Sequence, residues 1–118
     1  MIDVRGVYEV AIKVSDLARA EAFYCGTLGL EVGLRDAKRP WLFLRAGEGM
    51  VVLQEQPGPI PRQHFAFSAS EEAIARAADS LERAGVATAG PMVHDWIPAV
   101  SLYFADPDGH DLELCAPR

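Results

Sequence analysis

A duplication limits the folds open to this chain more than any other feature of its sequence. The stretch EVAIKVSDL at 9–17 aligns with HFAFSASEE at 64–72. In both copies an alternating apolar pattern is followed by serine, an acidic residue and a helical pattern. Glu9 falls on His64 in this alignment. A sequence that repeats in this way indicates one supersecondary unit used twice.

The duplication continues in the second half of each copy. The stretch WLFLRAGEGMVVLQEQP at 41–57 aligns with SLYFADPDGHDLELCAP at 101–117. Each contains an apolar strand pattern, a turn with glycine, a second strand pattern and a proline. We therefore expect two modules, at about 7–57 and 62–117, in a pseudo-twofold arrangement. The proline-rich PGPIPRQ at 57–63 would join them.

Each module has the pattern of a strand, a helix and then three strands. Ser15 or Asp16 can cap the first helix, and Ser70 can cap the second. Gly29 and Gly85 stand where these helices would end. The predicted strands lie near residues 8–14, 30–35, 41–46, 50–55, 64–68, 86–90, 100–105 and 110–115. This repeated order predicts an α+β fold, in which two tandem βαβββ modules form a curled mixed sheet around a cleft.

Length and charge restrict the classes of protein to consider. A chain of 118 residues suits a single domain, here residues 1–118. A net charge of −6 argues against binding to nucleic acid or to an anionic membrane, since both need clustered basic side chains. No apolar run reaches the length of a membrane span. Cys25 and Cys115 form no CxxC pair and are expected to be reduced thiols in a cytoplasmic protein.

The alternation of side chains along the strands separates a polar face from an apolar one. Side chains two residues apart on a strand share a face. Glu9 therefore lies opposite the apolar residues of its strand, and His64 and Glu113 do the same on theirs. If the apolar faces pack under the helices, the other faces line a cleft. We expect all three side chains to project into it.

The stretches EVAIKVSDLARAEAFYCGTLGLEV, HFAF and YFADPDGHDLEL together resemble the vicinal-oxygen-chelate superfamily. This superfamily contains glyoxalase I, extradiol dioxygenases, fosfomycin-resistance proteins and bleomycin-binding proteins. The resemblance covers nearly the whole chain and implies metal ligands at Glu9, His64 and Glu113. Glu9 stands where the family usually has histidine. A glyoxalase-type fourth ligand would fall on Leu53, the repeat partner of Glu113, and leucine cannot bind a metal.

One imidazole and two carboxylates form a ligand set dominated by oxygen. This set suits Mn²⁺, Fe²⁺, Co²⁺, Ni²⁺ or Mg²⁺, and Zn²⁺ is a further candidate. Three protein ligands on an octahedral ion leave positions open for two neighbouring oxygens of a substrate. The metal would then stabilise a developing negative charge as a Lewis acid. Glu113 and Glu9 are also the candidate catalytic residues, because either carboxylate could instead carry a proton.

These residues predict a divalent-metal-dependent enzyme acting on a small oxygen-rich molecule. Lyase, isomerase and epoxide-opening transferase chemistry all remain open. Leu53 disfavours glyoxalase I chemistry, and the single histidine disfavours extradiol oxygenation. The DPDGHDLEL ending most resembles the fosfomycin-resistance group. The alternative is a non-catalytic protein that binds and sequesters a small molecule or antibiotic, since some relatives have lost their ligands. The resemblance also implies a homodimer, with each site formed within one chain or between two.

Several residues have an ordinary structural interpretation beside the functional one. Glu9 could pair with Lys13 instead of a metal. In the loop PMVHDWIP, His94 and Trp96 either contact a substrate, with Trp96 stacking on it, or only pack. His110 follows the turn DPDG and is expected to be solvated, facing with the apolar side by parity or capping the hairpin. The aromatic residues near the predicted cleft are expected mainly in the core: Trp41, Phe43, Tyr103 and Phe104.

Overall fold

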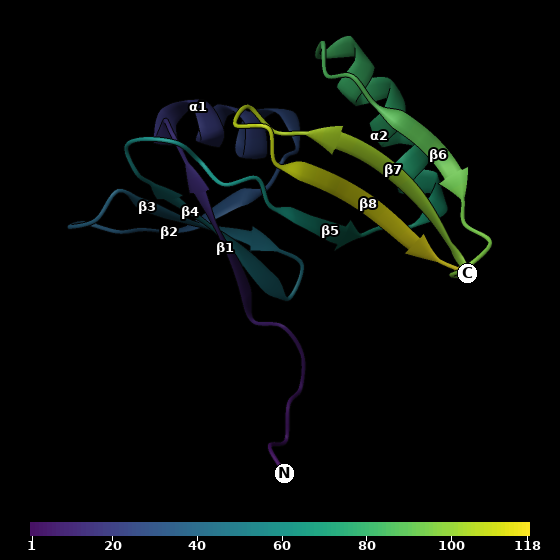
Figure 1. Ribbon diagram of the computed structural model, residues 1–118, viewed down its shortest axis with the longest axis horizontal. Helices are drawn as coiled ribbons and strands as arrows, with labels where there is room; N and C mark the ends of the chain where they lie inside the picture. The colour runs from purple at the N-terminus through teal and green to yellow at the C-terminus, as the bar shows by residue number, and fades with distance from the viewer. The chain divides into compact units, whose positions relative to one another are not determined.

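The computed structural model describes residues 1–118 and divides them into two compact units, Met1–Pro61 and Arg62–Arg118 (Figure 1). The first unit consists of β1 (Glu9–Val14), α1 (Leu17–Glu21), the π-helical turn η1 (Ala22–Thr27), β2 (Glu31–Arg35), β3 (Trp41–Ala46) and β4 (Gly49–Glu55). The second consists of β5 (His64–Ser68), α2 (Glu71–Arg83), β6 (Ala89–Val93), β7 (Ala99–Ala105) and β8 (Asp111–Pro117). No helix is both long enough and apolar enough to cross a membrane.

Each unit is built around a four-stranded mixed sheet. The strand order is β1-β4-β3-β2 in the first unit and β5-β8-β7-β6 in the second. In both, the first strand pairs in parallel with the last, and the other pairs are antiparallel. This arrangement confirms the predicted α+β fold with two repeated βαβββ modules. The strands form two separate sheets, and the prediction of a single domain over 1–118 stays a prediction.

In the first unit the predicted helix forms, and it changes from an α-helix to a π-helical turn along its length. The Asp16 carboxylate caps α1 by accepting a hydrogen bond from the Arg19 backbone N–H at 3.0 Å. After α1 the chain widens into η1, whose Phe23 and Tyr24 side chains are buried. Gly29 follows with a φ of +82° and bonds back to the Cys25 carbonyl, so it ends the helix as predicted. The apolar side chains of one sheet face form the core, among them Ile12, Val14, Leu42, Leu44 and Leu53.

The second unit repeats this plan with one regular helix. Ser70 caps α2, because its hydroxyl accepts from the Ala73 N–H at 3.1 Å. Gly85 follows the helix with a φ of +80°. Ile74 and Leu81 are the buried residues of α2, which packs against β6, β7 and β8. The opposite face of the sheet therefore remains available for polar side chains.

The strand predicted near 86–90 forms later, as β6 at Ala89–Val93. The Gly90–Pro91 dipeptide lies inside this strand at an irregularity between Ala89 and Met92. Gly90 has a φ of +110°, and a Cβ there would lie 2.7 Å from the Ser101 carbonyl oxygen. Glycine is therefore required because β6 passes unusually close to β7.

The repeat partner of Glu113 is Val52, and its assignment to Leu53 is wrong. In β8, Glu113 pairs with Ala66 of β5. The corresponding pair in the first unit joins Ala11 to Val52, one residue earlier than the sequence alignment places it. Leu53 lies on the core face and is fully buried. Valine, like leucine, offers no metal ligand, so this position contributes none.

A longer turn in the second unit explains the shift. Phe43 pairs with Val52 across the β3–β4 hairpin, whereas Tyr103 pairs with Glu113 across β7–β8. The second hairpin therefore has one more residue between its paired positions. This residue lies in the DPDG turn, where Asp106 Oδ1 accepts hydrogen bonds from the backbone of Asp108 and His110.

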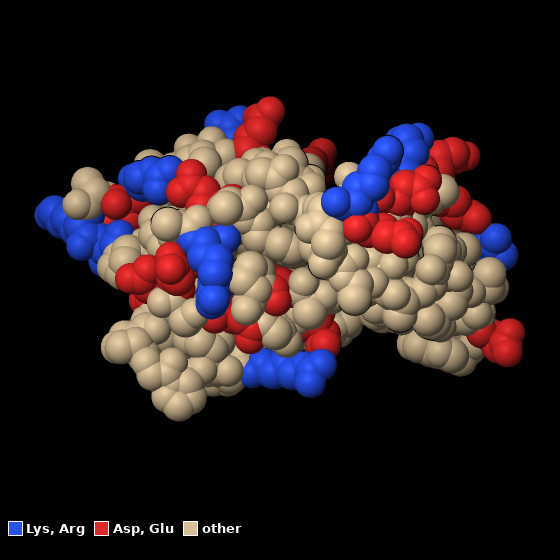
Figure 2. All heavy atoms as spheres, turned by 90° about the horizontal axis from the view of Figure 1, so that it is seen from above, with Lys and Arg blue, Asp and Glu red and all other residues tan.

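Charged side chains of both signs are interspersed on the face drawn in Figure 2. Several of them pair within a unit. Arg35 contacts Glu21 at 2.9 Å in the first unit, and Arg118 contacts Glu71 at 3.0 Å in the second. The Arg118 hydrogen bond lowers the pKa of Glu71 below its ordinary value. These exposed pairs contribute little to stability.

We expect Ser70→Ala to lower the free energy of unfolding by about 1 kcal/mol, because the first turn of α2 loses its side-chain cap. Ser80→Ala is the matched control, since Ser80 is an exposed serine inside the same helix. Alanine is the better helix former there, so the control should keep or slightly raise stability. Denaturant unfolding followed by circular dichroism measures both. Equal losses in the two variants would contradict the assigned cap.

Candidate metal-binding site

Two of the three predicted ligands lie together on the polar face of the second sheet. His64 begins β5 and pairs with Asp111, and Glu113 lies two residues further along the parallel partner strand β8. The His64 Nε2 atom is 3.3 Å from Glu113 Oε1. The His64 side chain is 54% exposed and that of Glu113 is 13% exposed, so the pair opens to solvent on the histidine side.

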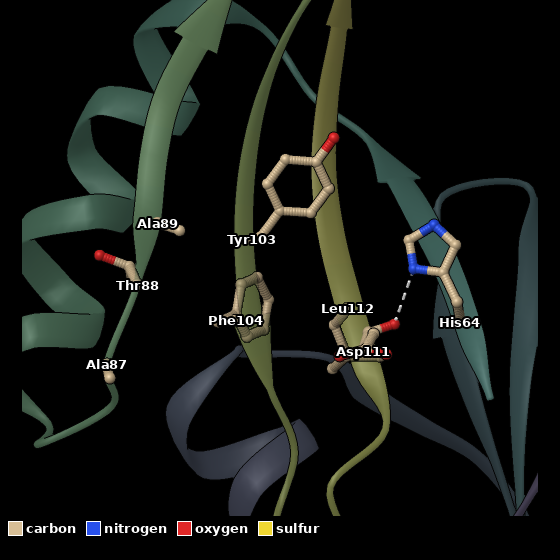
Figure 3. A pocket seen from close by; sticks show the side chains of 8 residues that line it. All are labelled: His64, Ala87, Thr88, Ala89, Tyr103, Phe104, Asp111 and Leu112. Atoms are coloured by element: carbon tan, nitrogen blue, oxygen red, sulfur yellow. Dashed lines mark hydrogen bonds between the residues drawn. The ribbon is translucent and has the colours of Figure 1, made fainter. Parts of the chain in front are cut away.

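A hydrogen bond at the other imidazole nitrogen, Nδ1, determines which ring nitrogen of neutral His64 carries the hydrogen. His64 Nδ1 lies 3.1 Å from the Asp111 backbone oxygen (Figure 3). A carbonyl oxygen only accepts, so the hydrogen is on Nδ1. The neutral ring then presents the lone pair of Nε2 to the Glu113 carboxylate. Two acceptors at this distance repel each other unless a proton or a metal cation lies between them.

The second carboxylate oxygen of Glu113 is already occupied. Ser101 in β7 donates from its hydroxyl to Glu113 Oε2 at 2.6 Å. Ser101 has no exposed surface. The protein therefore holds one oxygen of Glu113 and directs the other toward His64. Such an outer hydrogen bond is typical of side chains that orient metal ligands.

An open hollow of about 530 Å³ lies beside His64. Figure 3 shows His64 on one side of it and the segment leading into β6 on the other. Its lining is mainly small or aromatic: His64, Ala87, Thr88, Ala89, Tyr103, Phe104, Asp111 and Leu112. The charge of Asp111 is offset, because Arg62 donates to its Oδ1 at 2.6 Å and holds the pKa of that carboxyl below its ordinary value. The hollow can accommodate a small molecule beside the imidazole.

Tyr103 joins this site, although the sequence placed it mainly in the core. It pairs directly with Glu113 across the antiparallel β7–β8 ladder, and so shares its face. Its hydroxyl lies 3.0 Å from His94 Nε2, and the His94 and Trp96 rings are 5.6 Å apart. Trp96 is 80% exposed. Tyr103 lies two residues after Ser101 on the same strand. This spacing is the sequence signal that could have placed it on the polar face.

Glu9, the third predicted ligand, lies in the first unit at the start of β1. It is exposed and has no ion-pair partner. The alternative pair with Lys13 does not form, and the Lys13 ammonium donates to Gln54 Oε1 at 2.6 Å. Neither unit by itself groups three or more His, Cys, Asp or Glu side chains so that they could hold a metal. The convergence of Glu9 with His64 and Glu113 stays a prediction.

His110 is a structural residue, and the expectation that it is solvated is wrong. Its side chain is fully buried. Its Nδ1 accepts from the Gln63 backbone N–H at 3.0 Å, and its own backbone N–H donates to Asp106 Oδ1 at 2.8 Å. The ring is buried because these bonds hold the turn before β8 against the start of β5. His110 thus stabilises the strand pair that carries His64 and Glu113, the two predicted ligands.

The sequence profile of the glyoxalase/bleomycin resistance protein/dioxygenase superfamily matches residues 6–114. The chain belongs to this superfamily, as the sequence motifs predicted. The fold agrees with this membership. A crystal structure of the integron cassette protein HFX_CASS4, from the mobile metagenome of the Halifax Harbour sewage outfall, superposes with a TM-score of 0.90 at 45% identity. The match covers 96% of this chain and 99% of that one.

Two relatives carry names that describe an activity. Glutathione transferase FosA of Serratia marcescens is 31% identical over 121 residues, which cover 94% of this chain and 80% of FosA. Metallothiol transferase FosB of Lysinibacillus sphaericus (strain C3-41) is 26% identical over 118 residues, which cover 94% of this chain and 82% of FosB. Both similarities extend across the two modules.

We expect the neutral form of His64 to carry its hydrogen on Nδ1, because that atom donates to the Asp111 carbonyl. His110 supplies an internal control of the opposite kind, since its Nδ1 accepts a backbone hydrogen bond and its hydrogen must be on Nε2. Imidazole ¹⁵N chemical shifts, recorded at alkaline pH with assigned histidines, distinguish the two tautomers. An Nε2–H tautomer at His64 would rule out the proposed lone pair facing Glu113.

Proposed function

We propose that this protein is a divalent-metal-dependent enzyme acting on a small oxygen-rich molecule, and that His64 and Glu113 are two of its metal ligands. The observation that carries the proposal is the 3.3 Å contact of His64 Nε2 with Glu113 Oε1. The backbone bond at Nδ1 turns a lone pair toward a carboxylate there. A divalent cation relieves this repulsion and uses both atoms as ligands, which are of the types that Mn²⁺, Fe²⁺, Co²⁺, Ni²⁺ and Zn²⁺ accept.

Two protein ligands do not complete the coordination of such an ion. We propose Glu9 as the third, in agreement with its place in the repeat and with its lack of an ion-pair partner. We also propose that the protein is a homodimer. The supporting observation is the exposure of apolar side chains in the N-terminal segment, where Ile2, Val7 and Tyr8 are each more than 70% exposed.

The remaining residues of the second unit bind and orient the substrate in this proposal. The bound cation would supply Lewis-acid polarisation of a substrate oxygen. The hollow beside His64 takes the body of the substrate against Ala87, Ala89 and Phe104. The Tyr103 hydroxyl, next to Glu113 in the ladder, can hydrogen-bond to a polar group of the substrate.

The reaction we favour is addition of a thiol to a small epoxide. The thiol sulfur forms a bond to an epoxide carbon, the carbon–oxygen bond breaks, and the thiol proton passes to the new alkoxide. Support comes from the similarity to proteins named as glutathione and metallothiol transferases. The lyase and isomerase alternatives use the same three residues. In those reactions Glu113 or Glu9 would carry a proton instead of binding the metal.

We expect the purified protein to bind about one divalent cation per chain, measured by titration calorimetry with Mn²⁺ or Ni²⁺ after removal of metals. His64→Ala and Glu113→Gln should each weaken binding by at least about tenfold, because each removes a ligand atom. Glu82→Gln is the matched control, since Glu82 is exposed on α2. It should bind as the unaltered protein does.

Glu9→Gln tests the third ligand in the same titration. A loss comparable to that of Glu113→Gln would support its proposed role. Unchanged affinity would remove Glu9 from the site while leaving His64 and Glu113 in it. Unchanged affinity in all the ligand variants would contradict the proposed metal site.

We expect glutathione adducts when the metal-loaded protein is incubated with a panel of small epoxides and the products are analysed by mass spectrometry. The adduct should require the added cation and should be lost in Glu113→Gln but kept in Glu82→Gln. If instead a ligand binds unchanged and its affinity is independent of the cation, the alternative of a sequestering protein is favoured.

A further inference from the structure

A buried polar group, the hydroxyl of Ser101, lies beside the proposed metal site. It lies on β7 and is fully buried, yet it makes a short hydrogen bond of 2.6 Å to Glu113 Oε2. A hydroxyl that donates to an ionised carboxylate forms one of the stronger hydrogen bonds in proteins. Because Ser101 is closed off from water, no solvent molecule can take over this bond.

The strands around Ser101 keep it in place. β7 is a central strand, so Ser101 has a partner on each side: Met92 in β6 and Cys115 in β8. On the β6 side, Gly90 approaches so closely that a Cβ there would lie 2.7 Å from the Ser101 carbonyl oxygen. The backbone of Ser101 therefore has little room to move, and its hydroxyl stays directed at the carboxylate.

This bond makes the two oxygens of Glu113 unequal. Oε2 receives the Ser101 hydrogen, whereas Oε1 faces His64 Nε2. A cation beside His64 therefore meets one free carboxylate oxygen. Ca²⁺ favours six to eight oxygen ligands and often takes both oxygens of a carboxylate, whereas smaller divalent ions accept one.

We propose that Ser101 is a positioning residue that limits Glu113 to one coordinating oxygen and thereby favours small divalent cations over Ca²⁺. The inference rests on the proposed function, because it requires a cation at His64 and Glu113. It goes further by naming the residue that determines which cations the site selects. In Ser101→Ala, Oε2 is released and Glu113 can turn to offer both oxygens.

Titration calorimetry with Ni²⁺ and with Ca²⁺, on metal-free protein, tests this proposal. In Ser101→Ala the ratio of Ni²⁺ affinity to Ca²⁺ affinity should fall about tenfold or more, within the range known for outer-sphere partners. Ser101→Thr keeps the hydroxyl and should restore the ratio. Ser68→Ala is the matched control, because Ser68 is an exposed serine on the same sheet, in β5.

If Ser101 had only a structural role, its replacement would weaken the binding of both ions equally. An unchanged ratio of Ni²⁺ to Ca²⁺ affinity in Ser101→Ala therefore overturns the proposal. If Ser101→Ala does not fold, Ser101→Cys replaces it, since a thiol of similar size is a much weaker donor. The same fall in the ratio is then expected, and an unchanged ratio again overturns the proposal. Failure of the unaltered protein to bind Ni²⁺ or Mn²⁺ would overturn the proposed function itself, which is a different outcome.

Discussion

The central interaction of the candidate site is the contact between an imidazole nitrogen, His64 Nε2, and a carboxylate oxygen, Glu113 Oε1. The Asp111 carbonyl accepts a hydrogen bond from His64 Nδ1, so in the neutral ring Nε2 carries a lone pair and lies 3.3 Å from Glu113 Oε1. Such a pair is stable only when a positive charge joins it. In the proposed function, the affinity of this site for a cation follows from the backbone hydrogen bond, because that bond selects the tautomer.

The sheet topology produces this contact. The first and last strands of the second module pair in parallel, which places His64 and Glu113 on one face with a stagger of two residues. The other face is buried under α2, so the alternation of side chains along the strands separates the predicted ligands from the core. The buried ring of His110 connects the turn before β8 to the chain before β5 and so keeps the two strands in register. The first unit has the same strand arrangement, and Glu9 begins its first strand.

The features predicted correctly from sequence are those that local rules determine. Strand alternation identified the polar face with His64 and Glu113, and capping residues such as Ser70 located the helices. The errors arose where the pairing between strands, and not the local sequence, determines the position of a residue. One extra residue in the DPDG turn moved the repeat partner of Glu113 from Leu53 to Val52. No local pattern revealed that Ser101 contacts Glu113, because this contact depends on pairing between distant segments.

The most direct test of the metal site is pulsed electron paramagnetic resonance on the Mn²⁺-loaded protein labelled with ¹⁵N only in histidine. The account predicts magnetic coupling of the Mn²⁺ ion to one histidine nitrogen, the Nε2 of His64, and loss of that coupling in His64→Ala. Coupling that persists in His64→Ala, or an ion bound with no histidine coupling at all, would contradict it.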